Sequence, residues 1–162
     1  MITGAGRATN VVGLVYLAAF APAQGESANS ILATSEPAPG WGSVSPAFDD
    51  DFLWHRQDTF HDSFCQDLDD IESLVMATTQ RPLARRCFDD VVGQPAWRTK
   101  PSWYQVSAHD RMIPPRTQRW MAERIRARET IELDTSHASF ATRPAQVLEL
   151  ITNAAASIRL VG

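Results

Sequence analysis

The sequence predicts an α/β fold in which parallel strands are flanked by helices. Residues 11–19 form one continuous apolar run, which is typical of strands that are covered on both faces. Residues 101–161 alternate strand and helix patterns, and strands joined by helical crossovers run parallel. With 162 residues, 44% of them apolar and 21% charged, the chain is long enough for one domain with a core.

The first predicted elements are a helix end and a buried strand. Residues 1–9 are small and suit the end of a helix. The strand at 11–19 ends before Pro22, since proline has no amide hydrogen for a sheet; residues 1–22 thus hold both elements. An arginine before the apolar run and small residues after it would also fit a secretory leader cleaved before Gln24. The run is too short to span a bilayer.

Residues 23–100 are expected to form a long loop and then a helical lid. Up to residue 51 the segment is rich in serine, proline, glycine and alanine, which is typical of a loop or an excursion from the main sheet. Over residues 52–90 apolar side chains recur at helical spacing, namely Phe60, Phe64, Leu68, Ile71, Leu74 and Val75. The acidic residues at 67–72 mark the start of the second helix, where carboxylates favour the dipole, so no metal site is expected.

The last segment, residues 101–162, is expected to run strand, helix, strand, helix. These elements are a strand at 102–107, a helix from Pro114 to about 127, a strand at 130–134 and a helix that begins at Pro144. Because the strands are joined by a helix, they are expected to lie parallel in one sheet.

Two ionisable side chains follow these two strands, Asp110 the first and His137 the second. In an open α/β sheet, ligands bind at the carboxyl ends of the strands. A histidine exchanges protons near neutral pH, and a buried carboxylate on its second nitrogen fixes the tautomer. Taken singly, the two residues would be a turn former and a surface residue. Their order and spacing predict instead the acid and base of a Ser-Asp-His hydrolase.

The composition excludes several other classes of function. A net charge of −4 argues against nucleic-acid binding, which needs a basic face. Cys65 and Cys87 lack the spacing of a zinc site and would form at most one bridge. No cofactor is expected, and since nothing demands an oxidising compartment, the expected location is the cytoplasm.

Four parts of the chain resemble the α/β-hydrolase superfamily, in the order of that family. Residues 107–114 (SAHDRMIP) resemble its acid loop, and residues 134–138 (DTSHA) resemble its histidine loop. Residues 12–22 resemble the strand that follows the nucleophile helix. Residues 52–54 and 60–64 resemble the lid of the small esterase and hydroxynitrile-lyase-like branch.

The resemblance implies hydrolysis of a small carboxylic ester by a Ser-Asp-His mechanism in the complete protein. If Phe20, Phe52 and Trp54 face the pocket, they predict an apolar or aromatic ester, although core or lid packing would explain these residues equally well. The nucleophile motif of the family, G-x-S-x-G, occurs nowhere in the 162 residues. The family places that motif upstream of residues 11–19, so we expect a single truncated domain, the C-terminal portion of the fold, with little turnover.

Two other classes of function stay open at this point. The first is a non-catalytic binding module on the same fold, and the second is a secreted domain whose leader is cleaved. The expected partner is a small-molecule ester, with neither nucleic acid nor a membrane. In a partial fold the strand at 11–19 would lack one sheet neighbour, so the chain is expected to aggregate or to form a homodimer through that exposed edge.

Overall fold

A parallel three-stranded sheet forms the centre of the computed structural model, which describes residues 2–159. Its strands are β1 (Leu14–Leu17), β5 (Ser102–Ser107) and β6 (Thr130–Leu133), in the order β1-β5-β6. In register, Tyr16 pairs with Tyr104, and Ser107 pairs with Leu133. The predicted parallel strands are therefore confirmed, although β1 is shorter than the apolar run.

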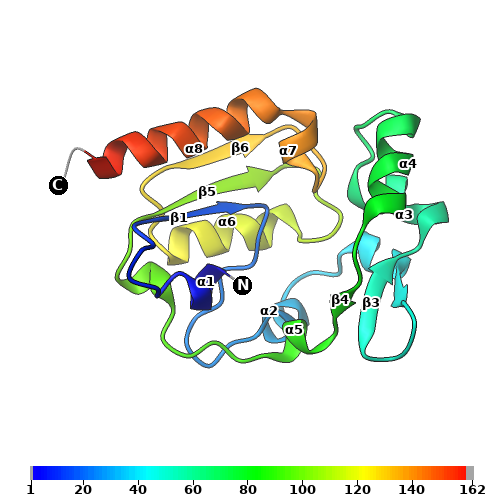
Figure 1. The fold of residues 1–162 in the computed structure, drawn as a ribbon, viewed down its shortest axis with the longest axis horizontal. Coiled ribbons are helices and arrows are strands. Elements are labelled where there is room, and N and C mark those ends of the chain that lie inside the picture. Colours follow the sequence, from blue (N-terminus) through cyan, green and yellow to red (C-terminus); the bar gives the residue numbers. More distant parts are fainter. Residues whose placement is uncertain (1, 160–162) are drawn as a thin grey trace.

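Helices cover both faces of this sheet (Figure 1). Side chains of successive strand residues point to opposite faces. Tyr104 and Val106 of β5 therefore meet α6 (Pro115–Arg124), whereas Trp103 meets α8 (Pro144–Arg159). On the α6 face, the stacked rings of Tyr16 and Tyr104 lie 5.9 Å apart. The sheet is thus a buried central layer, as the continuous apolar run of its first strand predicted.

A second, antiparallel sheet and two helices lie beyond the carboxyl ends of β5 and β6 (Figure 1). We call residues 44–84 the lid. It contains β2 (Val44–Pro46), β3 (Phe52–His55), α3 (Gln57–Phe64), α4 (Asp70–Thr79) and β4 (Leu83–Ala84). The remaining short elements are α1 (Ile2–Ala5), α2 (Ala28–Thr34), α5 (Arg86–Asp89), α7 (Ser139–Thr142) and 3₁₀ helices at Pro39–Ser43 and Ala96–Arg98.

The middle of the chain is where the sequence prediction is partly wrong. Residues 52–55 were expected to be helical, but they form β3 and pair with β2 and β4. The segment before them, expected to be a loop, contains α2 and a 3₁₀ helix. A strand of three or four residues has too little periodicity to be recognised, and its hairpin partners decide its conformation.

Helix α4 buries small side chains and exposes large apolar ones. Ser73 and Ala77 are buried, whereas Ile71, Leu74 and Val75 of the predicted helical pattern lie exposed. Asp69 caps the start of the helix, and its Oδ1 accepts hydrogen bonds from the backbone N of Ile71 (2.9 Å) and of Glu72 (2.8 Å). This is the expected capping role of the acidic cluster.

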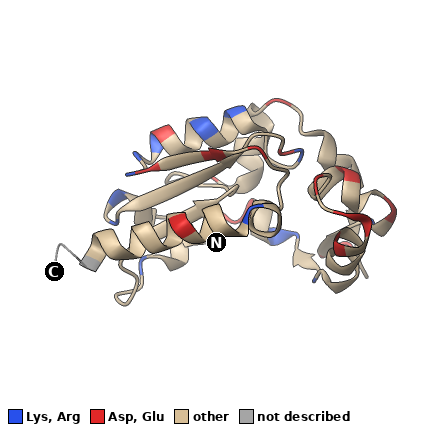
Figure 2. Cartoon of the chain, turned by 90° about the horizontal axis from the view of Figure 1, so that it is seen from above, with Lys and Arg blue, Asp and Glu red and all other residues tan. Residues whose placement is uncertain are grey.

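The charged residues are unevenly distributed over the molecule. Figure 2 shows acidic residues gathered on the lid, around α4.

Among residues 2–159 no group of three or more histidine, cysteine or carboxylate side chains is placed to hold a metal ion. No helix in this range has both the length and the apolar composition that crossing a membrane would require.

Candidate active site

The carboxylate of Asp110 lies in the turn after β5 and is completely shielded from solvent. Its Oδ1 accepts hydrogen bonds from the backbone N of Met112 at 2.6 Å and of Ile113 at 2.9 Å. Its Oδ2 accepts a hydrogen bond from Nε2 of Gln118 at 2.7 Å. A buried carboxylate that receives several donors is held in one orientation, because every alternative leaves donors unpaired.

His137 lies in the loop after β6 and completes the set of contacts to Asp110. Its Nδ1 is 2.7 Å from Oδ2 of Asp110, and its side chain is 20% exposed. An ionised carboxylate only accepts hydrogen bonds, so Nδ1 of His137 carries the proton. The lone pair of the neutral imidazole is then on Nε2, and this nitrogen makes no hydrogen bond within residues 2–159.

The parallel sheet explains why two residues far apart in sequence meet. The carboxyl ends of β5 and β6 lie side by side, and the loops that follow them stay paired by backbone hydrogen bonds. The N of Ala108 donates to the O of Leu133 at 2.9 Å, and the N of His109 donates to the O of Thr135 at 3.0 Å. The acid and histidine loops are therefore held side by side at the carboxyl edge of the sheet.

The lid is tied to both loops by polar contacts that the sequence did not reveal. Oδ2 of Asp67 accepts a hydrogen bond from the backbone N of Ser136 at 2.8 Å, next to His137. Nε2 of Gln66 donates to the O of His109 at 2.7 Å. Burial acts to raise the pKa of Asp67, but hydrogen bonds from Ser136, Thr142 and its own backbone together outweigh it and lower the pKa. The chain that links α3 to α4 thus fastens the lid beside the Asp110–His137 pair.

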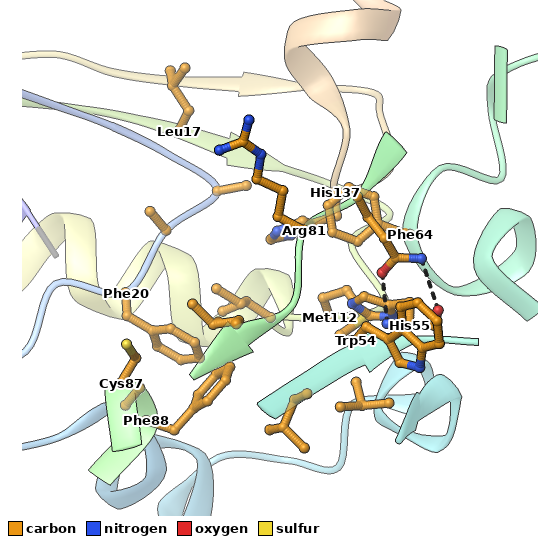
Figure 3. Close-up of a pocket in the computed structure, with 18 of the residues that line it drawn as sticks. Leu17, Phe20, Trp54, His55, Phe64, Arg81, Cys87, Phe88, Met112 and His137 are labelled. Carbon is orange, nitrogen blue, oxygen red and sulfur yellow. Dashed lines mark hydrogen bonds between the residues drawn. The ribbon is translucent and has the colours of Figure 1, made fainter. Parts of the chain in front are cut away.

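A cavity of about 1070 Å³ lies between the sheet and the lid, and His137 is part of its wall. Most of its wall is apolar and aromatic, including Phe20, Trp41, Trp54, Phe60, Phe64 and Phe88. Figure 3 shows Phe20 and Phe88 at one end of the cavity, away from His137 and Phe64. Of the three predicted lining residues, Phe20 and Trp54 line the cavity.

Phe52, the third residue predicted to face the substrate, does not line this cavity. It is the first residue of β3, and its side chain is 38% exposed. The next residue, Leu53, takes the position in the wall instead. The residues that follow in the same strand, Leu53, Trp54 and His55, all line the cavity, so Phe52 lies just outside its wall.

His55 is a cavity residue that the sequence analysis missed, since it was placed in a lid helix. It lies on β3, with its ring edge-on to Phe60 and to Phe64 at centroid distances of 5.7 and 5.3 Å. Its Nδ1 is 2.7 Å from Oγ of Ser43. Burial, followed by the charge on His137, lowers the pKa of His55 from 6.5 to about 4. No spacing motif marks this residue, because the β2–β3 pairing brings Ser43 to it.

Comparison with solved structures shows that other proteins share this fold. A pyrethroid hydrolase from Sphingobium faniae has a TM-score of 0.68 at 19% identity, over 88% of this chain and 60% of that one. A methylesterase from Arabidopsis has a TM-score of 0.70 at 15% identity, over 90% and 59%. A tomato methylketone synthase in complex with 2-tridecanone has a TM-score of 0.65 at 15% identity, over 90% and 62%. The chain thus spans about three fifths of the length of these structures.

Comparison at the level of sequence identifies the family. No curated protein matches the chain at a significant level. The model of the alpha/beta hydrolase family, however, matches residues 1–150, which include both β1 and the loops of Asp110 and His137. Together with the parallel sheet, the flanking helices and the lid, this match shows that the chain belongs to the alpha/beta hydrolase family.

Proposed function

We propose that Asp110 and His137 are the acid and base of a carboxylic ester hydrolase of the Ser-Asp-His type. The observation that carries the proposal is the 2.7 Å contact between Oδ2 of Asp110 and Nδ1 of His137 in the wall of an apolar cavity. This contact keeps the proton on Nδ1 and stabilises the imidazolium that forms when Nε2 accepts a second proton.

Each proton transfer in the proposed reaction passes through Nε2 of His137. Nε2 takes the proton of a serine hydroxyl while the serine oxygen bonds to the ester carbonyl carbon. It then returns that proton to the departing alcohol oxygen as the ester bond breaks, which leaves the acyl group on the serine. Water then attacks this acyl group and gives a proton to Nε2, and Nε2 returns a proton to the serine oxygen as the acid is released. The 162 residues contain no G-x-S-x-G motif, so the proposal assigns this serine to a complete protein in which the motif is present.

The size of the cavity favours an ester that is bulkier than the one predicted from the sequence. Its volume of about 1070 Å³ is slightly above the usual range of ligand pockets, roughly 300–1,000 Å³. Its aromatic wall favours aromatic or long apolar groups through their burial from water. The name of one structural neighbour, a pyrethroid hydrolase, fits the same class of substrate.

Hydrolysis of aryl esters by the purified chain, beside His137→Ala, tests the proposal. We expect weak turnover that depends on His137, since a positioned general base alone contributes about 10²-fold or more. We also expect no rapid initial release of the aryl alcohol, because water would be the nucleophile. Equal rates for the chain and for His137→Ala would contradict the proposal.

A non-catalytic binding module is the second candidate function. Two observations favour it, namely the apolar cavity and the lack of the nucleophile motif in the sequence. Binding of a bulky aromatic ester without any hydrolysis, in a complete protein, would support this candidate.

The proposal of an ester hydrolase also includes a location in the cytoplasm and a homodimer that forms through the edge of β1.

A further inference from the structure

We propose that His55 determines substrate specificity by accepting a hydrogen bond from a hydroxyl or N–H group of the substrate. The inference rests on the proposed function and names its substrate class more closely, as an aromatic ester that carries a hydrogen-bond donor. His55 belongs to the lid, whereas Asp110 and His137 belong to the loops after the parallel sheet.

The contacts of Ser43 determine which nitrogen of His55 carries the proton. Oγ of Ser43 lies 2.7 Å from the carbonyl oxygen of Gly40 and 2.7 Å from Nδ1 of His55. The Gly40 carbonyl can only accept a hydrogen bond, and the hydroxyl has a single hydrogen to give. Both short contacts are satisfied when Ser43 donates to Gly40 and Nδ1 of His55 donates to Ser43. Nε2 of His55 then has a free lone pair.

His55 and His137 therefore present the same tautomer with different partners. Nδ1 of His137 donates to a carboxylate, which stabilises a second proton on that ring. Nδ1 of His55 donates to a neutral hydroxyl, and its ring is packed edge-on against Phe60 and Phe64. Consistent with this, burial and then the charge on His137 lower the pKa of His55 to about 4. At neutral pH His55 is thus an acceptor of hydrogen bonds and not a base.

The distance between the two imidazoles limits where the donor of the substrate lies. The ring of Phe64 separates them, with centroids 5.3 Å from His55 and 4.7 Å from His137, so the two imidazole centroids are at most 10.0 Å apart. Figure 3 shows these residues together at one end of the cavity. An ester carbonyl beside His137 would therefore bring a donor to His55 when the two are separated by about one aromatic ring.

Few other groups on this part of the cavity wall could accept a hydrogen bond from a donor group of the substrate. Trp54, Phe60, Phe64 and Met76 of the neighbouring wall offer no strong acceptor, and Oε1 of Gln80, which also lines the cavity, already accepts a hydrogen bond from the backbone N of His55 at 2.8 Å. A ligand that fills this part of the cavity without a donor would displace water from Nε2 of His55 and leave it unpaired, which weakens its binding. The cavity therefore discriminates between aromatic esters of the same shape by a single polar atom.

The experiment compares two aromatic esters of similar shape by titration calorimetry at pH 7, phenyl 4-hydroxybenzoate and phenyl 4-fluorobenzoate. We expect the chain to bind the hydroxy ester about five- to tenfold more tightly, the factor of one neutral hydrogen bond. In His55→Phe the preference should disappear, and in His55→Gln, which places an acceptor oxygen near Nε2, it should return in part. Ser43→Ala, which frees the tautomer, should reduce it. His61→Phe, a lid histidine outside the cavity, is the matched control and should keep it.

The outcomes separate this inference from the proposed function. A chain that binds both esters equally well, or a His55→Phe variant that keeps the preference, overturns the role of His55 and leaves the ester-binding cavity intact. A chain that binds neither ester overturns the cavity as a substrate site and the inference with it. Because His55→Gln retains a polar group at this position, its result also separates lost recognition from a lid that fails to fold.

Discussion

Nε2 of Gln118 on α6 lies 2.7 Å from Oδ2 of Asp110 and 2.7 Å from the carbonyl oxygen of Ile113. Its Oε1 accepts a hydrogen bond from the N of Ser107 at 3.0 Å. One buried amide therefore joins the end of β5, the acid loop and the carboxylate that holds His137. Helix α6, and not β5 alone, orients Asp110.

Replacing Gln118 with leucine should destabilise the chain by about 2–3 kcal/mol. The variant leaves the N–H of Ser107 unpaired and removes a donor from a buried carboxylate, and each loss carries a desolvation cost. Urea unfolding measures the difference. Arg116→Ala, an exposed change on the same helix, should stay within about 0.5 kcal/mol of the original chain. A Gln118→Leu variant as stable as this control would contradict the orienting role.

His55 should make stability depend on pH in a defined window. Its pKa is lowered from 6.5 to about 4, so between these values the unfolded chain binds a proton that the folded chain does not. The free energy of unfolding from this residue therefore decreases as the pH falls from 6.5 toward 4. In His55→Phe this part of the slope should vanish. NMR titration of the His55 ring gives the second readout, and a ring that is already protonated at pH 6 would contradict the prediction.

Asp67 should contribute stability at neutral pH that is lost in acid. Because hydrogen bonds from Ser136 lower its pKa from 3.8, its contribution is present above that value and disappears as the pH falls through the folded-state pKa. The stability difference between the chain and Asp67→Ala should thus be largest near pH 7 and should shrink below pH 4. Asp62→Ala, whose carboxylate is 82% exposed, is the matched control for the loss of a lid carboxylate. Chemical denaturation across this pH range is the measurement.

The free edge of β1 should promote association between chains. Within residues 2–159 this strand pairs with β5 on one side and with no strand on the other. Sedimentation velocity over a range of concentrations should detect dimers or larger species. Val12→Lys, at a residue that is 61% exposed and lies two positions before β1, should reduce association by charge repulsion. Leu148→Lys, which is 60% exposed on α8, should not. A monodisperse monomer at every concentration would refute the prediction.

The sequence by itself determined the α/β class and the parallel strands. The reason is that these features are local: an unbroken apolar run marks a buried strand, and two strand and helix units imply a crossover. It also singled out Asp110 and His137, because residues that follow parallel strands meet at one edge of the sheet. The structure then brings their side chains within 2.7 Å of each other.

Only the tertiary structure decided the lid and the polar contacts around the site. Whether residues 52–55 form a helix or a strand depends on pairing with β2 and β4, which no local pattern encodes. Within that strand, Leu53, Trp54 and His55 line the cavity wall, whereas Phe52 at its start is 38% exposed. The partners Gln118 and Ser43 are ordinary polar residues in sequence. Their roles arise because the fold buries them beside Asp110 and His55, where a hydrogen bond has no competing water.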